Sequence, residues 1–196
     1  MKMVITGHTK GIGKFLYDKF KEAEWEVVGL SRSNGYDINK DFDKVVEAAA
    51  GCDLFINNAY RDQQQTKLVW ALKDRVKRMI VMGSVSRLYP DLIATNYVQD
   101  KQELSEACRL ISLQPDSIDI LHFDMSFIEN TEVDLNEPTD FTSDYVIKYQ
   151  EIADAVDFWM NNPKVRQMEF LWKLTPFVYE QLKRANPNLD PSRITI

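Results

Sequence analysis

Short runs of β-branched and apolar residues alternate with longer stretches of helical periodicity, and this alternation constrains the fold more than any other feature of the sequence. The runs expected to form strands are 3–6, 26–30, 53–57, 78–82, 118–123 and 165–171. The expected helices are a stretch ending at about residue 21, then 42–50, 63–76, 91–113 and 147–160. Strands separated by helices imply a parallel sheet with right-handed crossovers and helices on both faces. We therefore predict an α/β fold, a doubly wound three-layer parallel sheet of six to seven strands.

The chain has 196 residues, which fits one α/β domain and leaves little room for a second. It contains no internal repeat, low-complexity segment or interdomain linker, so residues 1–196 are predicted to form a single domain. A polar segment at about 130–144 is expected to be a loop or lid at the ligand site. The tail at about 172–196 is expected to be an arm or an extra helix.

The composition of the chain limits the kinds of partner and site that it can have. A formal net charge of −6 argues against nucleic acid or an anionic membrane surface as the main partner. No apolar run approaches the roughly 20 residues that span a bilayer, and the apolar stretch at the N-terminus is too short for a signal peptide. Two cysteines and two histidines stand at scattered positions, which predicts neither a disulfide framework nor a metal site. A reduced cytoplasmic protein is therefore expected.

A glycine-spaced loop follows the first predicted strand and leads directly into the first predicted helix. Glycines let the backbone turn sharply and approach a pyrophosphate, and the helix N-terminus offers free N–H groups and a partial positive charge. Such a loop alone is a weak signal, but its place between a strand and a helix disfavours a turn used for packing only. The residues predicted to bind a cofactor here are Gly7, His8, Thr9, Lys10, Gly11, Ile12 and Gly13.

The Thr-Gly-x-x-x-Gly-Ile-Gly pattern of this loop resembles the cofactor motif of the short-chain dehydrogenase/reductase family. The resemblance covers about residues 1–171 and implies a Rossmann-type fold, a nicotinamide cofactor and hydride transfer to or from a carbonyl or alcohol. Asn58 and Ala59 end a segment similar to the family's Asn-Asn-Ala-Gly strand, and the resemblance implies that they border the cofactor's ribose. Tyr60 stands where the family has glycine, and its ring either crowds the cofactor side of the cleft or points away.

A tyrosine and a lysine, Tyr97 and Lys101, lie four residues apart in a predicted helix, so both can face one site. A nearby ammonium group and an oxidised nicotinamide would favour phenolate and lower the pKa of a tyrosine from its usual value of about 10. Tyr17 and Lys21 have the same spacing and are interpreted as a solvated helix face. The resemblance implies that Tyr97 is the general acid or base and that Lys101 also holds the ribose hydroxyls.

Ser84 lies thirteen residues before Tyr97, which is the family's usual spacing. The resemblance implies that its hydroxyl donates a hydrogen bond to the substrate's carbonyl oxygen, with Ser86 as a weaker candidate. The predicted catalytic residues are therefore Ser84, Tyr97 and Lys101. The family also commonly uses an asparagine in a proton relay, and residues 61–79 contain none. The relay is then either rerouted, or the activity is low.

The residues after the second predicted strand bear on the choice of nicotinamide. Enzymes that hold NAD place a carboxylate there, which binds the ribose 2′-OH and repels a 2′-phosphate. Ser31, Arg32 and Ser33 stand at this place, and Lys10 resembles the second basic position of NADP-preferring family members. Arginine binds phosphate through two parallel hydrogen bonds, and lysine adds a point charge. NADP(H) is therefore the predicted cofactor, although either cation alone would be interpreted as a surface charge.

Asp37 and Ile38 resemble the family's Asp-Val pair, which packs on the adenine. Only four residues separate Arg32 from Asp37, where the family usually has a helix and a strand. The missing strand is expected to be one at the edge of the sheet, where a deletion is tolerable.

Residues 125–131 occupy the place of the family's Pro-Gly-x-Val-x-Thr segment, which touches the carboxamide of the nicotinamide. The proline and the glycine are absent. Strict spacing puts Asn130 at the threonine position, and one inserted residue puts Thr131 there. Ile128 and Thr131 are the predicted contacts.

Three functions stay open: an NADP(H)-dependent carbonyl reductase or its reverse, a non-catalytic NADP-binding sensor or partner protein, and a non-redox enzyme such as an epimerase or dehydratase. The glycine spacing disfavours the third. A small carbonyl or alcohol is the expected substrate, and Tyr60, Tyr89 and residues 130–144 are expected to select it. The family resemblance suggests a homodimer or homotetramer formed through the long helices.

Overall fold

The computed structural model of the chain describes residues 1–88, 96–125, 128, 147–162 and 167–170. Its strands are β1 (Lys2–Thr6), β2 (Glu26–Leu30), β3 (Leu54–Asn57), β4 (Arg78–Met82), β5 (Asp119–Met125) and β6 (Gln167–Phe170). Its helices are α1 (Gly11–Glu22), α2 (Phe42–Ala49), α3 (Gln64–Leu72), α4 (Asn96–Ser112) and α5 (Tyr149–Asn161), with short 3₁₀ turns η1 (Arg32–Asn34) and η2 (Val85–Leu88).

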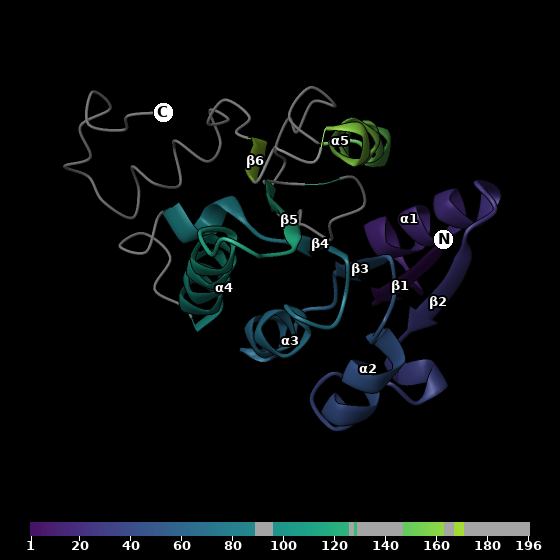
Figure 1. Ribbon diagram of the computed structural model, residues 1–196, viewed down its shortest axis with the longest axis horizontal. Helices are drawn as coiled ribbons and strands as arrows, with labels where there is room; N and C mark the ends of the chain where they lie inside the picture. The colour runs from purple at the N-terminus through teal and green to yellow at the C-terminus, as the bar shows by residue number, and fades with distance from the viewer. Residues whose placement is uncertain (89–95, 126–127, 129–146, 163–166, 171–196) are drawn as a thin grey trace, which may run out of the picture.

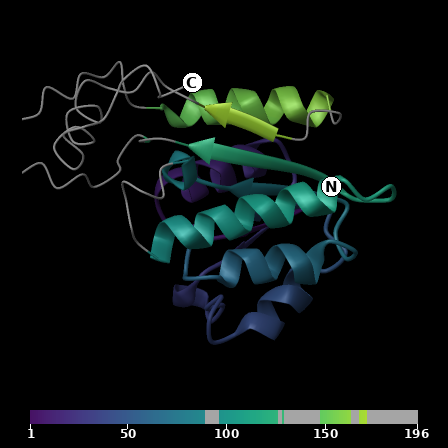
Figure 2. The same ribbon diagram turned by 90° about the vertical axis from the view of Figure 1, so that its left-hand side faces the viewer.

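The six described strands form one sheet in the order β2-β1-β3-β4-β5-β6, and every neighbouring pair is parallel. Helices α2, α3 and α4 cover one face of this sheet, and α1 and α5 cover the other (Figures 1 and 2). The predicted three-layer, doubly wound parallel sheet is thereby confirmed, and the strand number lies in the predicted range.

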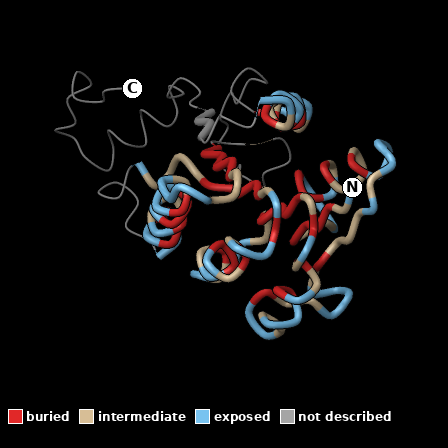
Figure 3. Tube along the Cα trace, viewed as in Figure 1, coloured by how far each residue is buried: buried red, intermediate tan, exposed pale blue. Residues whose placement is uncertain are grey.

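Alternate residues of each central strand serve opposite layers of the core. In β1, Val4 belongs to the cluster beneath α2, α3 and α4, whereas Met3 and Ile5 belong to the cluster beneath α1 and α5. The central strands are therefore apolar on both faces, as expected of a parallel sheet covered by two helical layers. Figure 3 shows this burial along the strands and along the inner faces of the helices.

Each helix buries a stripe of apolar side chains whose spacing in the sequence predicts it. In α1 the buried side chains Ile12, Leu16 and Phe20 recur every four residues, and this stripe packs on the sheet. The helix predicted at 63–76 ends earlier, at Leu72, because a turn closed by the N–H of Arg75 to the Leu72 carbonyl (2.9 Å) leads towards β4.

Residues 31–53, which connect β2 to β3, contain η1 and α2 but no strand, and β2 lies at the edge of the described sheet. Within η1 the Ser31 N–H donates to the Asn34 side chain (2.8 Å), which donates in turn to the carbonyl of Gly29 (2.8 Å). Gly35 then takes the left-handed conformation, with φ +80°, that reverses the chain. The expected loss of an edge strand agrees with this arrangement.

Both cysteines are free thiols buried in the core on the α2–α4 side of the sheet. Burial raises the pKa of the Cys52 thiol to about 11 and raises the pKa of Cys108 further. Within the described residues, no helix is both long enough and apolar enough to cross a membrane.

Several predictions fall on residues outside the described part of the chain. These are the start of the helix predicted at 91–113, Tyr89, the loop at 130–144 with Asn130 and Thr131, and the tail at 172–196.

Candidate functional site

A groove of about 1480 Å³ lies at the carboxyl ends of β1, β2 and β3. Most residues predicted to bind a cofactor line it: Gly7, Thr9, Lys10, Gly11, Ile12, Gly13, Ser31, Arg32, Ser33, Asp37, Ile38, Asn58, Ala59 and Ile128. The predicted residues His8, Ser84, Tyr97 and Lys101 are not part of its lining. Pockets for small ligands commonly measure about 300–1000 Å³, so a groove of this size suits a longer ligand such as a dinucleotide.

The glycine loop is packed so tightly that side chains cannot replace two of its glycines. A Cβ on Gly13 would lie 2.2 Å from the carbonyl oxygen of Gly7 and 2.5 Å from Nδ2 of Asn58. Gly7 itself has φ +73°. Nδ2 of Asn58 donates to the carbonyls of Thr6 (3.1 Å) and Gly7 (3.2 Å), which ties the loop to the end of β3. The loop is therefore held in one shape by the close approach of its own backbone and by the side chain of Asn58.

The N-terminus of α1 opens into this groove through Gly11, Ile12 and Gly13. The first N–H groups of a helix have no acceptor within it, and here no side chain of the N-cap residue Lys10 accepts from them. The first turn also holds no acidic residue. These free donors, with the partial positive charge of the helix end, fit a pyrophosphate.

His8 points away from the groove, although its neighbours in the loop line it. Its ring lies against Gly29, where an added Cβ would come within 2.3 Å of the imidazole, and stacks at 5.1 Å on Tyr17. The side chain of His8 therefore packs α1 against β2, and any contact with a cofactor would fall to its backbone.

Cations and hydroxyls gather at the end of β2. Arg32 and Lys10 are exposed, and neither forms an ion pair with any other described residue. The hydroxyls of Ser31 and Ser33 lie 2.8 Å apart beside Arg32. Such an arrangement presents two positive charges and two hydroxyls to an anion.

Asp37 is anchored by its own backbone turn. Its Oδ1 accepts from the backbone N–H of Asn39 (2.9 Å) and of Lys40 (3.4 Å). The first of these hydrogen bonds, aided by the charges of Lys40 and Arg32, holds the pKa of this carboxyl below its usual value. Asp37 is thus an acceptor fixed in place at the groove, next to the buried side chain of Ile38.

The three residues predicted to be catalytic are brought together at the ends of β4 and α4. The Ser84 side chain lies close enough to the Tyr97 hydroxyl to favour its phenolate, and Ser84 Oγ lies 2.9 Å from Ser86 Oγ. The ring of Tyr97 lies 5.5 Å from Nζ of Lys101. Although 37% of Tyr97 is exposed, desolvation of its hydroxyl raises its pKa, Ser84 opposes the rise, and the charge of Asp124 adds to it. The sequence predicts that a nearby ammonium group lowers this pKa, whereas the net shift in the structure is upward.

Tyr60 connects this cluster to the groove, which it helps to line. Its ring meets that of Tyr97 edge-on at a centroid distance of 4.8 Å, and its hydroxyl donates to Asp100 (2.8 Å). The Nζ atom of Lys101 lies 5.2 Å from the centre of the Tyr60 ring. The ring therefore lies on the cofactor side of the cleft, over Lys101 and edge-on to Tyr97, and does not point away from the groove.

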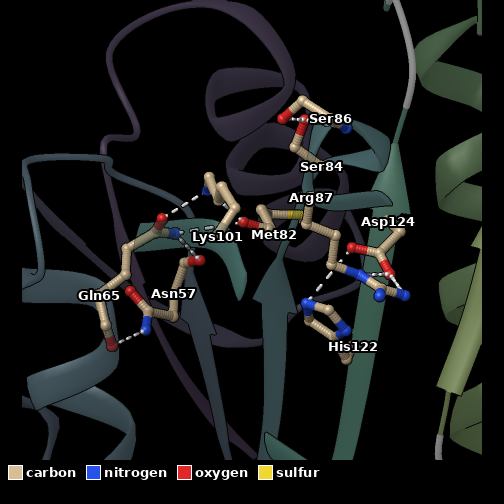
Figure 4. A network of polar contacts seen from close by, with 9 residues as sticks. All are labelled: Asn57, Gln65, Met82, Ser84, Ser86, Arg87, Lys101, His122 and Asp124. Atoms are coloured by element: carbon tan, nitrogen blue, oxygen red, sulfur yellow. Dashed lines mark hydrogen bonds and ion pairs between the residues drawn. The ribbon is translucent and has the colours of Figure 1, made fainter. Parts of the chain in front are cut away.

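Lys101 is 3% exposed and points beneath the two tyrosine rings. Its Nζ donates to Oε1 of Gln65 (2.6 Å) and to the carbonyl of Met82 (2.9 Å) (Figure 4). Burial lowers its pKa to about 8, although the carboxylates of Asp124 and Asp100 favour the charged form. An ammonium group has three donors, so one stays available for a further acceptor.

A buried ion pair lies on the other side of the Ser84 turn (Figure 4). Nε of Arg87, in η2, donates to the fully buried Asp124 of β5 (2.6 Å). His122 is 2% exposed, and burial lowers its pKa to about 4, so the imidazole is neutral. A Cβ on Gly83 would lie 2.5 Å from both Asp124 and His122, so only glycine lets the chain pass from β4 to Ser84 here.

The sequence analysis missed Gln65, His122 and Asp124. Each carries a visible signal, because each is a polar residue at a position where the pattern demands an apolar one. Gln65 lies three residues before Leu68 on the buried face of α3. His122 and Asp124 interrupt an otherwise apolar strand.

Comparison by sequence finds no matching family model and no matching curated protein. Among solved structures, a 3-alpha-hydroxysteroid dehydrogenase from Pseudomonas sp. B-0831, complexed with NADH, is 14% identical with a TM-score of 0.64 and covers 87% of this chain and 95% of its own. A short-chain dehydrogenase from Sphingobium yanoikuyae, in complex with NADPH, is 13% identical with a TM-score of 0.64 and covers 99% and 98%.

A Bacillus halodurans protein provisionally named as an NAD-dependent epimerase/dehydratase is 17% identical with a TM-score of 0.59, over 92% of this chain and 98% of its own. These three proteins differ in the cofactor or the reaction that their names give. At such identities the likeness establishes the fold alone. The chain therefore shares the Rossmann-type fold of short-chain dehydrogenases, which confirms the fold that the sequence predicted.

Proposed function

We propose that this protein is an NADP(H)-dependent oxidoreductase of the short-chain dehydrogenase/reductase family, which transfers a hydride between the nicotinamide and a small carbonyl or alcohol. The observation that carries the proposal is the meeting of Ser84, Tyr97 and Lys101 beside the glycine-loop groove. A dinucleotide groove alone would serve many reactions. A phenol beside a serine hydroxyl, with an ammonium group near its ring, supports proton transfer to a carbonyl oxygen.

The described residues fit such a cofactor along the whole groove. The α1 N-terminus would hold the pyrophosphate, and Arg32, Lys10, Ser31 and Ser33 would hold the 2′-phosphate. The remaining lining residues predicted to contact the cofactor are Asp37 and Ile38 at the adenosine, Asn58 and Ala59 at the ribose, and Ile128 at the nicotinamide. When bound, the reduced nicotinamide supplies the hydride.

Tyr97 is the proton donor in this proposal. Because burial raises its pKa, the phenol stays protonated at neutral pH and can donate to the carbonyl oxygen of a substrate. Ser84 donates a second hydrogen bond to the same oxygen, and its own oxygen is held by the backbone N–H of Ser86 (3.2 Å). The ammonium of Lys101 stabilises the negative charge that Tyr97 gains as its proton leaves.

The pH dependence of carbonyl reduction follows from Lys101. Its pKa of about 8 means that the ammonium is present below this pH and is lost as the pH rises through it. We expect kcat/KM for reduction to be level near neutral pH and to fall above about pH 8, while the equilibrium shifts towards alcohol oxidation at high pH because that direction releases a proton. Steady-state kinetics in both directions between about pH 6 and pH 10 measure this. A reduction rate that stays level to pH 10 would contradict it.

Cofactor choice provides a second test. Replacing both Arg32 and Lys10 by alanine should weaken NADP(H) binding far more than NAD(H) binding, because charge-assisted hydrogen bonds are worth about 1.5–3 kcal/mol each. The preference should therefore shift by at least about tenfold in a binding titration. The double variant of Lys21 and Lys67 changes the net charge equally away from the groove and should leave the preference unchanged. Equal losses for both cofactors would refute the assignment.

A non-catalytic NADP-binding sensor is the second candidate, and one observation favours it. The ring of Tyr60 lies over Lys101 and against the edge of the Tyr97 ring, on the groove side, and its hydroxyl is hydrogen-bonded to Asp100. A panel of carbonyl compounds assayed with NADPH separates the two functions. Turnover of any member supports the oxidoreductase, whereas NADPH binding without turnover across the panel supports the sensor.

A further inference from the structure

A buried glutamine, Gln65, lies in the segment 61–79 that contains no asparagine for the relay. Gln65 is 2% exposed in the first turn of α3, and its side chain reaches across to α4, where Oε1 accepts from Nζ of Lys101 (2.6 Å) (Figure 4). The sequence between residues 61 and 79, which offers no asparagine, thus provides a different amide that contacts the lysine directly.

The orientation of this amide is fixed by its other partners. Its Nε2 donates to the carbonyl of Asn57 (3.0 Å), at the end of β3, and to that of Met82 (3.3 Å), at the end of β4. Carbonyls only accept and an ammonium only donates, so the oxygen of the amide must face Lys101. The Asn57 side chain donates to the Gln65 carbonyl (2.9 Å), which secures the first turn of α3 to the same strand.

The charges around Lys101 determine what its hydrogen bond to Gln65 does. Both hydrogen-bond acceptors of the Lys101 ammonium among the described residues, Oε1 of Gln65 and the Met82 carbonyl, are uncharged. The charged or titratable groups around it are Asp100 and Cys108 in α4, Asp124 and the neutral His122 in β5, and the two tyrosines, Tyr60 and Tyr97. A dipolar acceptor holds an ammonium group in place without neutralising its positive charge towards Tyr97.

We propose that Gln65 is a positioning residue that directs the Lys101 ammonium towards Tyr97 and keeps it charged. The role in catalysis rests on the proposed function, whereas the effect on Lys101 does not. Replacing Gln65 by leucine removes the acceptor and should lower the pKa of Lys101. Replacing it by glutamate adds a negative charge and should raise that pKa.

The experiment is an NMR titration of the full chain labelled with ¹³C-lysine, with the Lys101 signal assigned through Lys101→Arg. We expect the Lys101 midpoint to move down by about one pH unit in Gln65→Leu and up by a similar amount in Gln65→Glu. Gln64→Leu and Gln64→Glu are the matched controls, since Gln64 lies in the same turn of α3 and donates to Asn39 instead. Unchanged midpoints in both Gln65 variants would overturn the proposal.

A measurement on the unmodified protein covers the case in which a Gln65 variant does not fold. The side-chain carbonyl carbon of Gln65 should titrate with the same midpoint as Lys101, because the two groups share a hydrogen bond. Independent midpoints would overturn the proposal. If the carbonyl panel yields a substrate, the alkaline limb of the kcat/KM profile should move with the Lys101 midpoint in each variant. If the panel yields none, the titration alone decides the role of Gln65. A failure of the proposed function is therefore distinguishable from a failure of the Gln65 proposal.

Discussion

Tyr97→Phe should lower turnover by about 100-fold or more and leave NADPH affinity nearly unchanged, because general acid catalysis contributes about 10²–10⁴ to a rate. The substitution removes only the hydroxyl. The ring, which packs edge-on against Tyr60, stays in place. Steady-state kinetics on a substrate found by the carbonyl panel, together with a binding titration, separate the loss of the acid from a loss of structure.

Tyr17→Phe is the matched control, since Tyr17 has a lysine at the same spacing and lies in α1 against His8. It should change neither turnover nor binding. If Tyr97→Phe retained the turnover of the unmodified protein, the mechanism would be wrong even though the fold is right, and the proton would have to come from another donor.

Gly13→Ala should abolish cofactor binding in practice and lower the melting temperature. The new methyl group would lie 2.2 Å from the Gly7 carbonyl oxygen, a backbone atom that cannot move without opening the loop. Overpacking of this kind costs about 1–3 kcal/mol, which corresponds to several degrees for a chain of this length. Alanine favours a helix over glycine by about 0.5–1 kcal/mol, so any loss is due to the contact and not to helix propensity. Thermal unfolding and NADPH titration measure both effects.

Gly51→Ala supplies the comparison. Gly51 has φ +75° and no heavy atom within 4 Å of an added Cβ, so the variant carries backbone strain alone, about 1–2 kcal/mol. It should lose stability without losing cofactor affinity. Equal NADPH affinity in the two variants would show that the glycine loop is not the pyrophosphate site.

The sequence predicted the sheet well because its physical signal is local. Buried parallel strands are continuous apolar runs, and the helices between them repeat their apolar residues every three or four positions. β2 and β4 have the predicted bounds. The glycine loop lies at the carboxyl end of β1, where the strand–loop–helix order places it. The spacing between Ser84 and Tyr97 likewise predicted that the two side chains lie close together.

What the sequence could not give is the surroundings of these side chains, because those depend on contacts between residues far apart in the chain. The separation of Lys101 from Tyr97 showed that they share a helix face, but not that the lysine is buried under Tyr60 with Gln65 as its acceptor. The pKa of Tyr97 was expected to fall, and it rises because desolvation of the hydroxyl and the charge of Asp124 disfavour the phenolate. Desolvation is a property of the folded packing and has no counterpart in residue spacing.

The two buried cysteines allow local unfolding of the protein to be measured by thiol alkylation. A thiol reacts as its thiolate, and both Cys52 and Cys108 are buried with a raised pKa. Alkylating reagents in solution therefore react with neither thiol while the core is folded. Both thiols lie in the layer beneath α2, α3 and α4, and none lies beneath α1 and α5 among the described residues. Alkylation therefore records the opening of one helical layer only. The chain carries two native reporters of local unfolding on the side of the sheet that holds Gln65 and Lys101.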